Sequence, residues 1–196
     1  MTRLGERVRS VGAAMRPLRA GHGGLAVNRR AFRDVPDCIR VSSPEFGVGR
    51  DLPQRYTADG EGVSPPLAWE GVPAGAHSLM LLVEDPDAPL LFPLVHALAL
   101  GLPADAGGGL EAGALPVRMR VPAHSGMFMG RNTLGTPGWI PPSPIPGHGA
   151  HRYAFQVFAL ASDPRPDWPP GRGYALRQAR GNVLGKGTVF AAYERH

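Results

Sequence analysis

This sequence of 196 residues lacks the residues that an intrachain disulfide or a membrane-spanning segment would need. Its only cysteine is Cys38, so no disulfide can form within the chain. No apolar stretch is long enough to cross a bilayer, and the apolar residues from Val11 to Met15 are too few for the core of a signal peptide. These absences predict a cytoplasmic protein without an integral membrane segment.

Charged side chains are also sparse, at 19% of the residues, and Lys186 is the only lysine. The formal net charge is nevertheless +5. Residues 1–40 contain nine arginines against Glu6, Asp34 and Asp37, a balance of +6 that leaves −1 for the rest of the chain. A basic arm on a near-neutral body is not the basic groove that nucleic-acid binding requires, so we expect no nucleic-acid partner.

The N-terminal arm has the apolar spacing of a helix. Its apolar residues recur at intervals of three and four, at Leu4, Val8, Val11, Met15 and Leu18. We therefore expect an amphipathic helix within a basic extension, residues 1–38. This helix is expected to pack on its own domain or on a second subunit. The alternative is a membrane-surface helix, although the stripe lacks the Trp or Phe that such helices usually bury.

Residues 39–196 are expected to form the main domain, and short strands dominate their pattern. The 27 glycines and 22 prolines follow no collagen-like period, so they mark turns. Apolar runs predict strands at 39–43, 79–84, 95–100, 151–161 and 189–193, a helix at 174–184 and a flexible loop tip at 107–109. Trp69 is the predicted core anchor. Short strands between Pro and Gly turns predict a mostly β fold, a sandwich or barrel, with the strand from His151 lying centrally in its sheet.

Three segments place polar side chains beside these apolar runs. Asp85-Pro-Asp-Ala-Pro89 follows a buried strand, and its prolines hold both carboxylates in a rigid turn. His96 lies on the next apolar run. In the third segment, 141–153, a proline-rich loop ends in Gly-His-Gly, where glycines allow backbone N–H groups to turn toward an anion. Taken singly, the first segment is explained by an ordinary Asp-Pro turn, and His96 by a hydrogen-bonded core histidine.

Together and in this order, the three segments resemble the signatures of the phosphatidylethanolamine-binding protein family, in its bacterial branch. The flanking segments 56–60, 64–69, 130–135 and 183–185 resemble that family too, so the similarity runs from about Ile39 to the C-terminus. The resemblance implies an antiparallel β-sandwich with a few peripheral helices, a homodimer, and a cis bond within the first segment, before Pro89. The sequence departs from the family pattern at Leu94, Ala97, Leu134, Ile140, Pro141 and Ser143.

The resemblance also implies a small pocket for phosphate, acetate or the phosphorylethanolamine head of a lipid. Transferred by motif, the pocket residues are Asp85, Asp87, His96, Ser143, His151 and Tyr153. One aspartate is expected to orient an imidazole, and the other to meet the ammonium of a zwitterionic head group. We expect His96 and His151 to face one void.

These residues favour a non-catalytic binding protein, not an enzyme, with neither a cofactor nor a metal. One alternative is an inhibitor or regulator that grips a phosphorylated or C-terminal segment of a partner protein. Another is a metal-dependent hydrolase, in which two of His96, His148 and His151 join an aspartate around a metal ion. The sequence has none of the standard metal-ligand spacings, which makes the hydrolase the weaker alternative.

Overall fold

The computed structural model describes residues 3–117, 126–164 and 166–195. Among the described residues from Ile39 onward, strands outnumber helical segments. The helices are α1 (Arg3–Met15) and α2 (Arg172–Ala179), and the short 3₁₀ helices are η1 (His22–Gly24), η2 (Ala26–Asn28), η3 (Arg30–Phe32) and η4 (Gln54–Tyr56). The strands are β1 (Arg40–Ser42), β2 (Leu67–Glu70), β3 (Ser78–Asp85), β4 (Leu94–Leu102), β5 (Gly107–Leu110), β6 (Phe128–Met129), β7 (His151–Leu160) and β8 (Val183–Tyr193).

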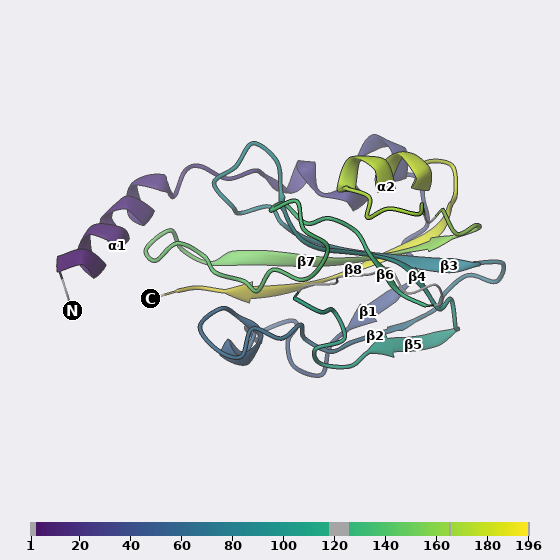
Figure 1. The fold of residues 1–196 in the computed structure, drawn as a ribbon, viewed down its shortest axis with the longest axis horizontal. Coiled ribbons are helices and arrows are strands. Elements are labelled where there is room, and N and C mark those ends of the chain that lie inside the picture. Colours follow the sequence, from purple (N-terminus) through teal and green to yellow (C-terminus); the bar gives the residue numbers. More distant parts are fainter. Residues whose placement is uncertain (1–2, 118–125, 165, 196) are drawn as a thin grey trace.

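The strands form two antiparallel sheets that pack face to face (Figure 1). The larger has the order β6-β4-β3-β7-β8, and the smaller has the order β1-β2-β5. The helix α2 and the 3₁₀ segments η1 to η3 cover the other face of the larger sheet. This arrangement confirms the predicted mostly β sandwich with peripheral helices. It also places β7 inside its sheet, between β3 and β8.

The strand β3 lies at the centre because both of its faces are apolar. Leu79, Leu81 and Val83 pack against the smaller sheet, and Met80 and Leu82 pack against the helical layer. All five side chains are fully buried. A continuous apolar run is the expected pattern for a strand covered on both faces, so the prediction at 79–84 is confirmed.

Two predictions about glycine-containing segments are wrong. Residues 107–109 were expected to form a loop tip, but they pair with β2 because Trp69 lies across them. A Cβ atom on Gly108 would lie 2.8 Å from Nε1 of Trp69, so only glycine lets the indole pack there. The predicted helix 174–184 ends at Ala179, because Gly181 adopts a φ of 74° and turns the chain into β8.

The strand β8 is therefore longer than the predicted 189–193, and its glycines explain why. A Cβ on Gly187 would lie 1.8 Å from the carbonyl oxygen of Ile39. The low β propensity of Gly185 and Gly187 hid this half of the strand, yet their lack of a side chain lets residues 38–39 pack on it.

The N-terminal helix forms as predicted, but its apolar stripe does not pack on its own domain. Leu4 is 72% exposed, Val11 56% and Leu18 55%. The helix α1 instead contacts the body through Gly12, where a Cβ would lie 2.1 Å from the carbonyl oxygen of Pro146. Packing of the stripe on a second subunit stays a prediction. Within the described ranges, no helix has the length and apolar character to cross a bilayer.

Candidate functional site

The three sequence segments meet at one end of the larger sheet. The strand β3 ends there, and its antiparallel neighbours β4 and β7 begin there. Together with the loop 140–145 they enclose a cavity of about 260 Å³. Its walls comprise Asp85, Ala88, Pro89, Leu90, Leu94, His96, Ile140, Pro141, Ser143, Pro144, Ile145, His151 and Tyr153. Five of the six predicted pocket residues therefore line one cavity, and the exception is Asp87.

The carboxylate of Asp85 organises the first segment. It is buried, and its Oδ1 accepts hydrogen bonds from the backbone N–H groups of Asp87 and Ala88, at 2.7 and 3.0 Å. Its Oδ2 lies 2.7 Å from Nδ1 of His151. Asp85 thus orients an imidazole, as expected. The predicted cis bond is wrong, since every peptide bond among the described residues is trans.

The histidines His148 and His151 continue a hydrogen-bonded chain that starts at Asp85. Nε2 of His148 faces the carbonyl oxygens of Met15 and Leu18, at 3.0 and 3.2 Å, so this nitrogen must donate. Nδ1 of His151 lies 2.7 Å from Oδ2 of Asp85, and Nε2 of His151 lies 2.8 Å from Nδ1 of His148. The chain therefore links Asp85 to the backbone of the N-terminal arm and leaves neither ring with a free nitrogen.

The other two ring side chains of the cavity each leave a buried polar atom without a partner. Nδ1 of His96 donates to the carbonyl oxygen of Ile140 at 2.7 Å, so its Nε2 is a bare acceptor in the neutral ring. Burial lowers the pKa of His96, which favours that neutral ring. Burial raises the pKa of Tyr153, so its hydroxyl stays protonated. Neither Nε2 of His96 nor the hydroxyl of Tyr153 has a hydrogen-bond partner among the described residues.

Asp87 does not line the cavity and cannot meet a ligand's ammonium there. Its carboxylate is 1% exposed and accepts from Nε, Nη2 and the backbone N–H of Arg152, at 2.8 to 2.9 Å. Arg19 of the N-terminal arm pairs with it at 2.8 Å. Although burial raises the pKa of Asp87, the hydrogen bonds from Arg152 and Arg19 outweigh it and hold that pKa well below its ordinary value. Asp87 is therefore an anchor for the arm.

The proline-rich loop contributes mainly an apolar wall. Ser143 lines the cavity, and its Oγ accepts a hydrogen bond from Nη1 of Arg195 at 3.1 Å. One of the glycines expected to approach an anion packs against the N-terminal arm. A Cβ on Gly147 would lie 2.5 Å from the carbonyl oxygen of Arg9, so Gly147 gives room to α1.

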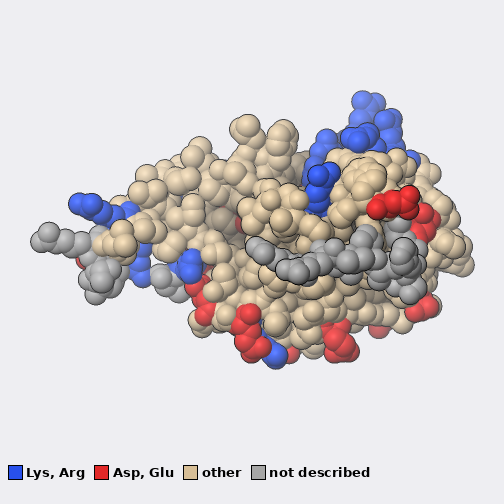
Figure 2. Space-filling view, in the orientation of Figure 1, with Lys and Arg blue, Asp and Glu red and all other residues tan. Residues whose placement is uncertain are grey.

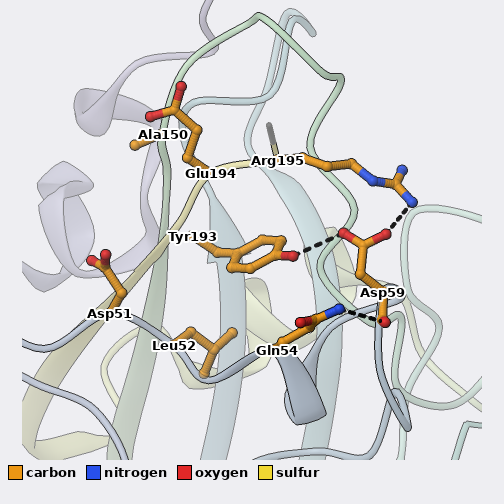
Figure 3. A pocket seen from close by; sticks show the side chains of 8 residues that line it. All are labelled: Asp51, Leu52, Gln54, Asp59, Ala150, Tyr193, Glu194 and Arg195. Atoms are coloured by element: carbon orange, nitrogen blue, oxygen red, sulfur yellow. Dashed lines mark hydrogen bonds and ion pairs between the residues drawn. The ribbon is translucent and has the colours of Figure 1, made fainter. Parts of the chain in front are cut away.

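A larger cavity near the C-terminus, of about 660 Å³, has Gln54, Tyr193 and Arg195 each bonded to Asp59 (Figure 3). The hydroxyl of Tyr193 donates to Asp59 at 2.8 Å, and Arg195 pairs with the same carboxylate. It offers a ligand no unpaired buried atom, so the smaller cavity is the better candidate.

Metal binding finds no support in the arrangement of the histidines. Within the residues that the structure describes, no group of three His, Cys, Asp or Glu is placed to hold a metal ion. The nitrogens of His148 and His151 are engaged with each other, with Asp85 and with backbone carbonyls. Among these three histidines, only His96 has a ring nitrogen, Nε2, without a hydrogen-bond partner in the described part of the chain.

Sequence reasoning named His148 only as a metal ligand of the hydrolase alternative, and it missed Arg19 and Arg152. His148 and Arg152 stand inside the third motif, yet their partners are 130 and 65 residues away along the chain. The one available signal was the alternation of β7, which puts Arg152 on the opposite side of the strand from His151 and Tyr153.

Comparison with known proteins shows what this chain is similar to. The family model described as phosphatidylethanolamine-binding protein matches residues 42–194. A UPF0098 protein of Aquifex aeolicus is 35% identical over 175 residues, which cover 88% of this chain and 98% of the relative. A UPF0098 protein of Methanothermobacter thermautotrophicus is 40% identical over 159 residues, covering 80% of this chain and 99% of the relative.

Two solved structures share the fold. A phosphatidylethanolamine-binding protein homologue from Chlamydia trachomatis superposes with a TM-score of 0.71 at 29% identity, covering 82% of this chain and 99% of the other. YbcL of E. coli, a member of the mammalian phosphatidylethanolamine-binding protein family, gives a TM-score of 0.69 at 28% identity, with 81% and 99% covered.

Proposed function

Since this chain belongs to the phosphatidylethanolamine-binding protein family, we propose that it is a non-catalytic binding protein for a phosphate group, either free or in a phospholipid head group. Membership of the family supports a binding role in general. The observation that carries the specific ligand is the pair of unpartnered buried atoms, Nε2 of His96 and the hydroxyl of Tyr153, on the wall of one cavity.

An unpartnered buried polar atom costs roughly 1–3 kcal/mol, so two of them on one wall favour a ligand that satisfies both. Phosphate has the required chemistry. One of its bare oxygens accepts from the hydroxyl of Tyr153. A protonated phosphate oxygen donates to Nε2 of His96, or the imidazolium of His96 donates to a bare oxygen when the ring is charged.

The one carboxylate on the cavity wall is already bonded. Asp85 would repel an anion if its carboxylate were free, but His151 and two backbone N–H groups engage both of its oxygens. A bound phosphate therefore meets no free carboxylate and has one hydroxyl donor, that of Tyr153.

The size and the walls of the cavity limit what can enter. Its volume of about 260 Å³ lies just below the roughly 300–1,000 Å³ of ordinary ligand pockets. The side chains of Leu90, Leu94, Ile140 and Ile145 line it without offering hydrogen bonds. A phosphate with a short carbon chain, such as phosphorylethanolamine, fits this combination of one polar wall and several apolar ones.

Calorimetric titration of inorganic phosphate and of phosphorylethanolamine tests the proposal. The Tyr153→Phe variant removes one donor to a charged ligand, which should cost about 1.5–3 kcal/mol of binding free energy, tenfold or more in Kd. Tyr193→Phe is the matched control, because its hydroxyl is bonded to Asp59 outside this cavity. Equal phosphate affinity in the wild type and in Tyr153→Phe would refute the assignment.

Sulfate provides a second test, directed at His96. Near pH 8 sulfate has no proton to donate to the neutral ring, whereas hydrogen phosphate has one, so phosphate should bind more tightly. Near pH 5, below the ordinary histidine pKa of about 6.5, the anion can draw a proton onto His96 and the difference between the two anions should shrink. A difference that does not change with pH would remove His96 from the binding site.

A further inference from the structure

The loop between β3 and β4 exposes three consecutive apolar side chains to solvent. Leu90 is 45% exposed, Leu91 90% and Phe92 69%, and Pro89 and Pro93 fix the backbone on either side. The loop rises at the top of Figure 1, beyond the larger sheet. Large apolar side chains that are contiguous and exposed mark interaction surfaces more often than isolated ones do.

This loop joins the candidate pocket to a second cleft. Leu90 lines the phosphate cavity and also an apolar cleft that contains Leu91, Phe92 and Val95. Phe92 in turn lines a neighbouring cleft that is rich in arginine. The pocket, the apolar loop and the basic cleft therefore follow one another on one continuous surface.

The basic cleft gathers unpaired positive charge. Arg29, Arg30, Arg33 and Arg180 line it beside Phe92, and all four are exposed. None of them takes part in an ion pair between described residues. Figure 2 shows basic side chains gathered at the top of the molecule, beside uncharged side chains that project from the same surface.

The arm that carries three of these arginines is held against the body. A Cβ on Gly24 would lie 2.7 Å from Cδ of Pro93, so the glycine lets the arm pack on the end of the apolar loop. Nη2 of Arg172 donates to the carbonyl oxygen of Gly24 at 2.6 Å, and the backbone N–H of Ala26 donates to Glu84 at 2.8 Å. The arginines are therefore placed next to the loop by the fold.

We propose that this surface docks on an anionic lipid bilayer. The docking face consists of Leu90, Leu91 and Phe92 with Arg29, Arg30, Arg33 and Arg180. The apolar loop projects, so Leu91 and Phe92 can enter the head-group layer while the arginines meet lipid phosphates. A bilayer is favoured over an acidic protein surface because Leu91 and Phe92 can enter a fluid apolar layer without a preformed pocket, and the charged residues that line the adjoining cleft are all arginines.

The proposal rests on the proposed function, which it deepens. Docking would bring the mouth of the phosphate cavity, at Leu90, to the level of the lipid head groups. The phosphate that enters the cavity would then belong to a membrane lipid, and free phosphate would compete with it.

Vesicle co-sedimentation of the full chain tests the docking face. Vesicles of phosphatidylcholine with phosphatidylglycerol should bind the protein, and vesicles of phosphatidylcholine alone should bind it much less. The Leu91→Ser/Phe92→Ser double variant should bind about tenfold more weakly or worse, because it loses its apolar insertion. The Arg30→Gln/Arg33→Gln variant should lose about fivefold for each arginine.

Matched controls lie elsewhere on the surface. Val48→Ser removes another fully exposed apolar side chain, and Arg50→Gln/Arg55→Gln removes the same charge as the arginine variant. Neither control should change vesicle binding beyond its small effect on net charge. In a Phe92→Trp variant, the extra tryptophan emission should shift to shorter wavelength on vesicles and be quenched by brominated lipid.

The outcomes separate this proposal from the proposed function. Docking is refuted if the wild type does not bind anionic vesicles, or if Leu91→Ser/Phe92→Ser binds them with the same affinity as the wild type. Binding of Leu91→Ser/Phe92→Ser to inorganic phosphate should equal that of the wild type, since neither side chain lines the cavity. Conversely, Tyr153→Phe should lose affinity for inorganic phosphate but still bind phosphatidylcholine–phosphatidylglycerol vesicles through the docking face, weakened only by the share of affinity that comes from lipid phosphate in the cavity. A surface that captures acidic peptides but no vesicles would assign the docking face to a protein partner and overturn the membrane proposal.

Discussion

Replacing both arginines that pair with Asp87 should invert the pH dependence that this carboxyl group gives to the stability of the protein. Asp87 is 1% exposed and is surrounded by Arg19, from the N-terminal arm, and Arg152, from β7. Methionine at both arginine positions keeps much of the apolar stem and removes the charge. The variant therefore isolates what the two guanidinium groups do.

The expected loss of stability follows from these contacts. A hydrogen bond to a charged group contributes about 1.5–3 kcal/mol, and Arg19→Met should lie at the lower end because the Arg19 side chain is 31% exposed. The double variant leaves a buried carboxylate with only the backbone N–H at position 152 as a donor. An uncompensated buried charge of this kind costs about 3–5 kcal/mol.

The sign of the pH dependence follows from the pKa of Asp87. In the wild type this pKa lies below its unfolded value of about 3.9, so its stabilisation is complete above about pH 4 and is lost as the pH falls further. In the double variant burial is unopposed and raises the pKa of Asp87. The variant then recovers stability as the pH falls, because its carboxyl group can bind a proton.

Urea denaturation between neutral pH and about pH 4 measures this difference. The gap in the free energy of unfolding between wild type and Arg19→Met/Arg152→Met should narrow as the pH falls. Adding Asp87→Asn to the double variant should abolish the narrowing. Arg55→Met is the control, because its partner Glu61 is exposed and such pairs contribute at most about 1 kcal/mol. A gap that stays constant with pH would show that the arginines do not control the ionisation of Asp87.

Other predictions concern the arm, the pocket and the helical layer. Gly12→Val, or deletion of residues 1–20, should undock α1 and lower the melting temperature or change the oligomeric state, as measured by calorimetry and light scattering; no change in either would refute the docked arm. Because burial lowers the pKa of His96, the protein should lose stability as the pH falls below about 6.5, and His96→Leu should reduce that slope in urea denaturation. Arg172→Met should cost about 3–5 kcal/mol, because it leaves the fully buried carboxylate of Glu84 without a positively charged partner, and adding Glu84→Gln should restore part of the loss if the charge is the cause.

The fold could be predicted well where apolar residues run without interruption. The strand β3 and the strand from His151 were visible because their side chains are apolar on both faces. The glycine-rich strands β5 and β8 were not visible in this way. Glycine in a sequence predicts a turn unless the residue that packs against it in the fold is known. Trp69 across Gly108 and residue 39 across Gly187 turn those glycines into requirements for close packing.

In the candidate site, too, the sequence predicted some features correctly and others not. The motifs correctly bring Asp85, His96, His151 and Tyr153 to one cavity, because the ends of neighbouring antiparallel strands must meet. They also assign Asp87 to the cavity, although the turn that follows β3 directs its carboxylate to the arginines and away from the cavity.

The sequence by itself determined the order of apolar runs, and with it the sheets and the set of residues at their common end. The tertiary structure alone decided which polar atoms in that set remain available. His151 and Tyr153 stand two residues apart on one strand, yet His151 has both nitrogens engaged and Tyr153 has its hydroxyl free. The physical reason is that a hydrogen bond is satisfied by geometry within about 3 Å, and the partners here come from segments far away along the chain.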